Sequence, residues 1–219
     1  MDEKTIIARR VAMELQPGSL VNLGIGLPTL VASFVPRDAG IFFQSENGIV
    51  GMQAMLEQGL ETEDLTDAGG SPISALPGAA TFDSAFSFGL IRGGHLDVTV
   101  LGGLQVDRQG RLANWMVPGS MVPGMGGAMD LVTGARRVIV AMTHTAKGRP
   151  KLVDVCTLPV TSDRCVDLIV TELAVIQPTA QGLLLKELAP GTDVEAVQRA
   201  TGASLIVPDI VPWMDIGLT

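Results

Sequence analysis

Short apolar segments rich in Val and Ile constrain the fold of this chain more than any other feature. Residues 137–142 and 167–170 have this composition, which is typical of strands that are buried on both faces of a sheet. Further strands are expected over residues 20–23, 41–43, 96–101, 112–117, 182–188 and 204–207. Helices are expected over residues 2–15, 30–35 and 84–91, a further helix begins at residue 128, and the last helix runs from residue 192 to residue 200. Because strands alternate with helices, the pattern predicts an α/β fold with three layers, an open, mainly parallel sheet flanked by helices.

The length of the chain fits one domain. Its 219 residues are enough for one sizeable core, and they contain no internal repeat and no linker, so we expect a single domain over residues 1–219. No apolar run approaches the length of a membrane span, and no charged-then-apolar signal opens the chain. We therefore expect a cytoplasmic protein without a membrane partner, in which Cys156 and Cys165 remain reduced thiols.

The charge balance argues against nucleic acid as a partner. The formal net charge is -8 and the pI is near 4.7, whereas phosphate backbones bind clustered Lys and Arg. The acidic run over residues 52–70 is interpreted as a solvated face or a flap.

Local signals predict that Asp2 caps the first helix, that Thr192 and Glu195 form a capping box, and that Thr99 lies on a wetter face of its strand.

Glu46 is a candidate reacting group because of its position in the sequence. It follows the apolar run 41–43 and lies in Ser45-Glu46-Asn47-Gly48, and Asn and Gly favour a turn. Loops at the carboxyl ends of parallel strands form the ligand crevice of open α/β sheets. At this point Glu46 is either an ordinary loop residue that faces water or a reacting group at such an edge.

Two glycine loops accompany this turn. The first, residues 24–29, carries Gly24 and Gly26 but has Thr29 where a dinucleotide fingerprint needs a third glycine, so it is either a tight packing point or a set of amides close to a ligand. The second holds Gly124, Gly126 and Gly127 ahead of an expected helix. Three glycines in four positions leave backbone amides open to an approaching oxygen.

The remaining residues exclude several other chemistries. The two His and two Cys show no zinc spacing, and the chain has no Gly-x-Ser-x-Gly elbow and no P-loop. We therefore expect no metal site. The elimination favours Glu46 as a general base or covalent nucleophile, with amides of the loop from Gly124 to Gly127 stabilising an oxyanion.

Five motifs in order carry a resemblance to a known family. They are Val21-Asn22-Leu23-Gly24-Ile25-Gly26, Ser45-Glu46-Asn47-Gly48, Ile91-Arg92-Gly93-Gly94-His95, Leu112-Ala113-Asn114-Trp115 and Gly124-Met125-Gly126-Gly127-Ala128-Met129-Asp130. From about residue 5 to about residue 175, the chain resembles the β subunit of the 3-oxoacid CoA-transferases, of the acetate or acetoacetate type.

The resemblance implies a reaction and its residues. Glu46 would carry CoA as a glutamyl-CoA thioester in a ping-pong transfer between a short-chain acyl-CoA and a 3-oxoacid such as acetoacetate. The Gly127 amide would bind the oxyanion, and Asn22 would lie near the reacting carboxylate. Substrate-binding positions would be Asn47, Gly24, Gly26 and Gly126. It also implies a CoA-transferase α subunit as partner, and a CoA ester as substrate rather than a permanently bound cofactor.

The chain departs from the family at two places. Some members carry a lysine near Gly70 that helps to hold the CoA phosphates, so we expect the basic loop with Lys147 and Arg149, or the partner, to supply that charge. Many members continue with Gly-Pro after Gly51, whereas this chain has Met52. Two alternatives stay open: an acyl-CoA hydrolase that uses the same Glu46, and a non-catalytic small-molecule-binding domain.

Overall fold

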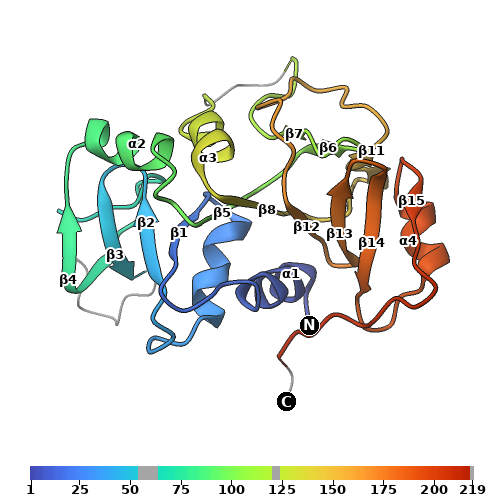
Figure 1. The fold of residues 1–219 in the computed structure, drawn as a ribbon, viewed down its shortest axis with the longest axis horizontal. Helices are drawn as coiled ribbons and strands as arrows, with labels where there is room; N and C mark the ends of the chain where they lie inside the picture. Colours follow the sequence, from blue (N-terminus) through green and yellow to red (C-terminus); the bar gives the residue numbers. More distant parts are fainter. Residues whose placement is uncertain (54–63, 120–123, 218–219) are drawn as a thin grey trace.

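The computed structural model describes residues 1–53, 64–119 and 124–217 (Figure 1). The described strands are β1 (Leu20–Leu23), β2 (Phe42–Ser45), β3 (Ile49–Gln53), β4 (Ser74–Thr81), β5 (Val98–Leu101), β6 (Gln105–Asp107), β7 (Leu112–Ala113), β8 (Arg137–Ala141), β9 (Thr145–Ala146), β10 (Arg149–Pro150), β11 (Leu152–Val153), β12 (Leu168–Val170), β13 (Ala174–Thr179), β14 (Gly182–Leu188) and β15 (Leu205–Ile206). The helices are α1 (Glu3–Ala12), the 3-10 helix η1 (Leu27–Phe34), α2 (Ser84–Arg92), α3 (Ala128–Gly134) and α4 (Val194–Ala200).

The main sheet of the described chain has ten strands, in the order β15-β14-β13-β12-β8-β5-β1-β2-β3-β4. Its centre, from β12 to β2, is parallel throughout. Antiparallel strands extend it on both sides, β3 and β4 beyond β2 and β13 and β14 beyond β12. The expected mainly parallel α/β sheet is confirmed, while the sequence missed β3, β4 and β13.

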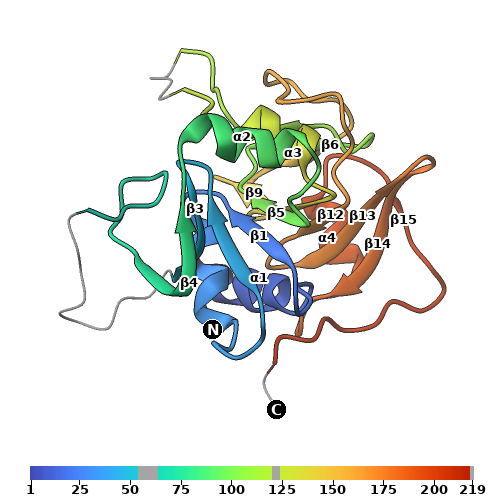
Figure 2. The same cartoon turned by 60° about the vertical axis from the view of Figure 1, so that its left-hand side comes forward.

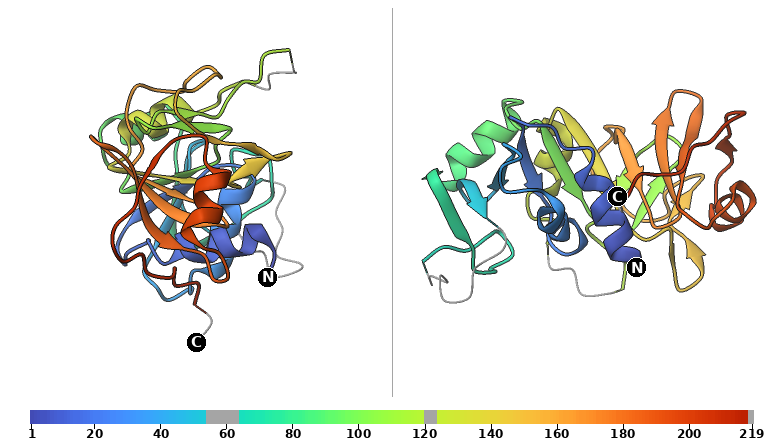
Figure 3. Two further views of the ribbon diagram at one scale, coloured as in Figure 1. Left: turned by 90° about the vertical axis from the view of Figure 1, so that its right-hand side faces the viewer. Right: turned by 90° about the horizontal axis from the view of Figure 1, so that it is seen from below.

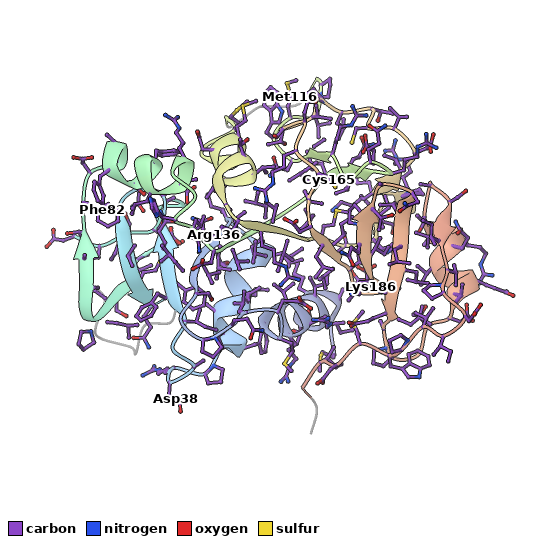
Figure 4. All side chains as sticks on the ribbon, viewed as in Figure 1. Asp38, Phe82, Met116, Arg136, Cys165 and Lys186 are labelled. Carbon is purple, nitrogen blue, oxygen red and sulfur yellow. The ribbon has the colours of Figure 1, made fainter. Side chains whose placement is uncertain are left out.

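Helices cover both faces of the sheet. Successive residues of β8 alternate between two hydrophobic clusters, with Ile139 in one and Val138 and Val140 in the other. One cluster includes side chains of α1 and η1, and the other includes side chains of α2 and α3. Helix α1 lies on one side of the sheet, and α2 and α3 lie on the other (Figures 1 and 2). Side chains fill both faces (Figure 4), so the three predicted layers are present.

Several local predictions can be compared with the structure. Asp2 caps α1, because its side chain accepts a hydrogen bond from the Thr5 amide. The capping box is wrong by one residue, since Asp193 rather than Thr192 accepts from the Ala196 amide. Thr99 is fully buried rather than on a wetter face. Cys156 and Cys165 are free thiols (Cys165 is labelled in Figure 4).

The two ends of the described chain lie close together. The C-terminal segment returns to α1, where Arg9 Nη1 donates to the carbonyl oxygens of Ile216 at 3.4 Å and Gly217 at 3.0 Å (Figure 3). No helix in the described ranges has the length and apolar character needed to cross a membrane. Most of the acidic run that we interpreted as a face or flap, residues 54–63, lies outside the described residues.

A buried histidine joins three elements on the C-terminal side of the fold. His144 follows β8, and its ring nitrogens lie 2.9 Å from Thr171 Oγ1, after β12, and 2.9 Å from Thr201 Oγ1, at the end of α4. Thr201 Oγ1 donates to the Val197 carbonyl at 2.7 Å, so it accepts from His144 Nε2, and Nδ1 is the ring nitrogen without a proton that faces Thr171 Oγ1. Burial lowers the pKa of His144 from 6.5 to about 4, which fits this neutral tautomer.

The His144 pKa predicts how stability depends on pH. The unfolded chain takes up a proton on this histidine near pH 6.5, and the folded chain does so only near pH 4. The contribution of neutral His144 to the free energy of unfolding is therefore complete above pH 6.5 and is lost as the pH falls toward 4. Between pH 7 and pH 5 we expect a loss of about 2 kcal/mol in unfolding free energy from this group. Urea titrations at both pH values measure it, and His144→Gln should remove this part of the loss. His95→Gln, at an exposed position, serves as the control; an equal pH dependence in wild type and His144→Gln would contradict the assignment.

Candidate active site

A row of buried polar side chains crosses three neighbouring parallel strands. Asn22 of β1 stands in register with Gln44 of β2 and with Thr99 of β5, and all three side chains are buried. Asn22 Nδ2 donates to Gln44 Oε1 at 2.9 Å, and Thr99 Oγ1 lies 3.4 Å from Asn22 Oδ1 as donor. Buried amides need such partners, so the row fixes which way the Asn22 amide points.

Glu46 lies at the end of this row. It sits in the tight turn between β2 and β3, where Asn22 Nδ2 donates to Glu46 Oε2 at 3.0 Å. The turn requires glycine at position 48, because φ is +127° there and a Cβ atom would overlap the carbonyl oxygen of Phe82. Glu46 is half-buried, which leaves its carboxylate accessible from outside while one oxygen is held.

Helix α2 supports the row from one face of the sheet. Gln44 Nε2 donates to Ser87 Oγ at 2.9 Å, and Ser87 is fully buried. The next residue, Phe88, reaches the glycine loop: a Cβ atom placed on Gly127 would lie 3.2 Å from the Phe88 ring. Adjacent residues of α2 therefore contact both the hydrogen-bond row and the loop that faces Glu46.

The glycine loop ends directly against Glu46. A Cβ atom on Gly127 would lie 3.4 Å from Glu46 Cγ, an ordinary contact distance, and 3.2 Å from the Phe88 ring, where it would press on the ring. Gly124 and Gly126 have positive φ angles of 103° and 51°. No described residue accepts a hydrogen bond from the Gly127 amide. This amide can therefore serve an oxyanion formed at Glu46.

A second loop, residues 66–71, lies on the other side of the turn. Asn47 Nδ2 donates to the Thr66 carbonyl at 2.7 Å, and the Ala68 amide donates to Ser45 Oγ at 2.9 Å. Within the loop, Asp67 Oδ1 accepts from the amides of Gly69 and Ser71. Residues on both sides of Glu46 thus hold this loop against the turn.

Two cavities meet at Glu46. The η1 cavity, of about 450 Å³, is lined by Leu23, Ile25, Gly26, Thr29, Leu30, Ser33, Ser45, Glu46, Met52, Asp67, Ala68, Gly69, Ser71, Pro72 and Ile73. The glycine-loop cavity, of about 560 Å³, is lined by Gly24, Ile25, Glu46, Ala68, Leu101, Gly102, Gly103, Leu104, Asn114, Trp115, Gly124, Met125, Gly126, Gly127, Ala128 and Leu131. Ile25, Glu46 and Ala68 line both, so Glu46 is accessible from two directions.

The structure brings most of the predicted site residues together. Asn22 donates a hydrogen bond to Glu46, Gly127 lies beside Glu46 in the lining of the glycine-loop cavity, and Gly126 lines the same cavity. Gly24 also lines it, but its amide donates to the Val100 carbonyl at 2.8 Å, in keeping with a packing role.

Other predicted residues lie differently. Gly26 lines the η1 cavity and has a positive φ angle of 92°. Asn47 lines neither cavity and instead holds the Thr66 carbonyl. Lys147 and Arg149 also line neither cavity, so a role for their loop in binding CoA phosphates finds no support there.

Sequence reasoning missed the supporting residues. Gln44, Ser87 and Phe88 received no role, although all three contact the catalytic candidates or their partners. A signal was present, because Gln44 and Asn22 are amides within otherwise apolar strands, and such residues need a buried partner. The partner itself depends on strand register and on the position of α2.

Comparisons with known proteins identify the fold of this chain. The acyl-CoA transferase YdiF of Escherichia coli has the same fold, with a TM-score of 0.78 at 21% identity over 98% of this chain. This chain spans 44% of the YdiF chain.

The sequence relatives are closer. The chain is 54% identical to the acetate CoA-transferase subunit beta of Haemophilus influenzae over 99% of this chain and 97% of that protein. It is 55% identical to the acetate CoA-transferase subunit beta of Escherichia coli over 93% of each chain.

Fold and site together define a protein that has an acyl-CoA transferase fold with a carboxylate at the carboxyl edge of its sheet. The family model described as Coenzyme A transferase matches residues 4–200. The chain belongs to the coenzyme A transferase family, and the resemblance inferred from its five motifs is confirmed.

Gln44 is predicted to position Asn22 and, through it, Glu46. Gln44→Met keeps the size of the side chain but removes both hydrogen bonds, which leaves the Asn22 amide free to turn. We expect kcat to fall about 10- to 100-fold, corresponding to the loss of buried hydrogen bonds, while KM for the acyl-CoA changes less than about threefold. Steady-state kinetics measures both constants.

Gln177→Met, on β13 and away from the site, is the matched control for this substitution. A Gln44→Met enzyme that is less stable but retains the wild-type kcat would assign Gln44 to folding alone.

Proposed function

We propose that this chain is the β subunit of a CoA-transferase that moves CoA between a short-chain acyl-CoA and a 3-oxoacid such as acetoacetate. The observation that carries the proposal is the arrangement of three groups: the Glu46 carboxylate, the Asn22 amide that holds one of its oxygens, and the Gly127 backbone beside its side chain. The acetate CoA-transferase names of the relatives at 54 and 55% identity point to the same activity.

The proposed reaction begins with an attack of Glu46 on the thioester. A carboxylate oxygen attacks the acyl-CoA carbonyl, the carbon–sulfur bond breaks, and a mixed anhydride and the CoA thiolate form. The thiolate then attacks the Glu46 carbonyl of the anhydride, which releases the first acid as its carboxylate and leaves a glutamyl-CoA thioester. A second carboxylate takes CoA by the reverse sequence, so no proton, water or cofactor is consumed.

Each group has a defined part in these steps. Asn22 holds one Glu46 oxygen at 3.0 Å and leaves the other to attack. The Gly127 amide stabilises the oxyanion of the tetrahedral intermediates, a kind of interaction worth about 10²–10³ in rate. Because both the anhydride and the thioester react with water, the site must also be closed during turnover.

A CoA-transferase α subunit is the proposed partner that closes the site. Ile25, at the boundary of the two cavities, is 69% exposed, and Phe86 and Met129 are also exposed apolar residues on α2 and α3. In the described parts of the chain, no Lys, Arg or His lines either cavity. The phosphates of CoA therefore need cations from elsewhere, and the α subunit is the proposed source. We further propose that the assembly acts in the cytoplasm.

The covalent intermediate is directly testable by mass. We expect the chain, purified with its α subunit and exposed to acetoacetyl-CoA without an acceptor acid, to gain the mass of CoA less one water and to lose this adduct with hydroxylamine. Glu46→Gln should abolish the adduct and lower kcat by roughly 10⁴-fold or more. Glu195→Gln, the same substitution at an exposed residue of α4, should retain the adduct.

Two other outcomes would favour the alternatives. Consumption of acyl-CoA that does not depend on an acceptor acid, with no adduct, would identify a hydrolase. An unchanged transfer rate in Glu46→Gln would remove Glu46 from the chemistry.

A further inference from the structure

We propose that the η1 cavity binds the carbon chain of the acid substrate, with Met52 and Ile73 limiting its length and Asp67 disfavouring a second carboxylate. This inference rests on the proposed function, since it names the substrate class that the same Glu46 serves. It concerns Met52, Ile73 and Asp67, to which the five sequence motifs gave no role.

The floor of the η1 cavity is part of the hydrophobic core. Leu23, Met52 and Ile73 line it and are 6%, 4% and 2% exposed, and all three belong to the core cluster that packs beneath α1 and η1. The rim carries the more exposed Ile25 and Leu30. A short apolar chain that extends from Glu46 toward this floor would be removed from water, which favours its binding.

The positions of the two cavities decide which part of the substrate each can take. The glycine-loop cavity holds the Gly127 amide, so it receives the oxyanion, and it is the larger of the two, which suits the long pantetheine arm of CoA. The η1 cavity lies across Glu46 from that loop and ends at packed core side chains. The reacting carbonyl carbon carries the CoA sulfur on one side and the acyl chain on the other. The acyl chain is short enough to end inside the protein, so it fits the η1 cavity.

Residues of β3 and of the segment that enters β4 form the floor of the η1 cavity. Met52 lies on β3, and Ile73 immediately precedes β4. Because protein cores are densely packed, these side chains cannot move aside for an additional methylene without strain. The chain length of the acid is therefore limited by the volume of the Met52 and Ile73 side chains.

Asp67 gives the same cavity a preference of charge. Among the described residues that line it, Asp67 and Glu46 are the charged ones, and no Lys, Arg or His accompanies them there. The Asp67 carboxylate is fixed, since its Oδ1 accepts hydrogen bonds from the amides of Gly69 at 2.8 Å and Ser71 at 2.9 Å. A dicarboxylic acid would place its second carboxylate near a like charge without a counterion, which is unfavourable in a partly buried site.

The first test measures chain-length preference. For the enzyme purified with its α subunit, kcat/KM is determined for acetate, butyrate and hexanoate as acceptors. In Met52→Ala we expect the hexanoate-to-acetate ratio to rise at least about tenfold. Ile73→Val, which removes a single methyl group, should raise the ratio about fourfold, and it tests the same floor if Met52→Ala does not fold.

The matched control for Met52 is Met125, which lines the glycine-loop cavity. Met125→Ala can lower activity, but it should leave the hexanoate-to-acetate ratio unchanged. An equal shift in both Met variants, or no shift in either Met52→Ala or Ile73→Val, would overturn the assignment of the acyl chain to the η1 cavity.

The second test measures charge preference with Asp67→Asn. An asparagine oxygen can accept the same two amide hydrogen bonds, so the loop is retained while the charge is removed. We expect kcat/KM for succinate relative to acetate to rise about fivefold or more. No rise would remove Asp67 from substrate selection. Failure of the wild-type enzyme to transfer CoA to any of these acids would instead contradict the proposed function itself, so the two failures are distinguishable.

Discussion

The hydrogen bonds of the Asn22 side chain are the interactions on which the site depends. One amide nitrogen donates both to Gln44 Oε1 at 2.9 Å and to Glu46 Oε2 at 3.0 Å, and Gln44 in turn donates to the buried Ser87 on α2. Every member of this chain of contacts is on a rigid element or on the tight turn beside one. A carboxylate on such a support keeps one oxygen directed at the substrate, which is the preorganisation that carboxylate nucleophiles need.

The sheet places this support between two different environments. On the α2 and α3 face, Gly127 lies beside both Phe88 and Glu46, and it lines the same cavity as Glu46. On the η1 face, buried core side chains form the end of a second cavity. The turn at Glu46 is the boundary between them, because the antiparallel step from β2 to β3 brings Glu46 out at the edge of the parallel strands. One geometric feature therefore gives Glu46 access to an oxyanion donor and to an apolar pocket.

The composition of the strands predicted the parallel centre of the sheet, whereas short motifs predicted the candidate site residues. β8 and β12 are continuous apolar segments, so their burial on two faces was readable from composition. β4 contains Pro77 and Gly78 within an edge strand, and these residues gave no strand signal. Glu46, Asn22 and Gly127 were found through motifs. The contacts of Gln44 and Phe88 could not be found that way, because they depend on strand register and on how α2 packs against α3.

The most direct measurement of the central claim is the transfer of oxygen to Glu46. When acetate labelled with oxygen-18 accepts CoA from the glutamyl-CoA thioester, its oxygen attacks the Glu46 carbonyl and remains on Glu46 after the CoA thiolate leaves with the acyl group. Mass spectrometry of the fragment that contains Glu46 should then show label after turnover with acetyl-CoA and labelled acetate. Turnover without label in that fragment would contradict the role of Glu46 as the covalent carrier.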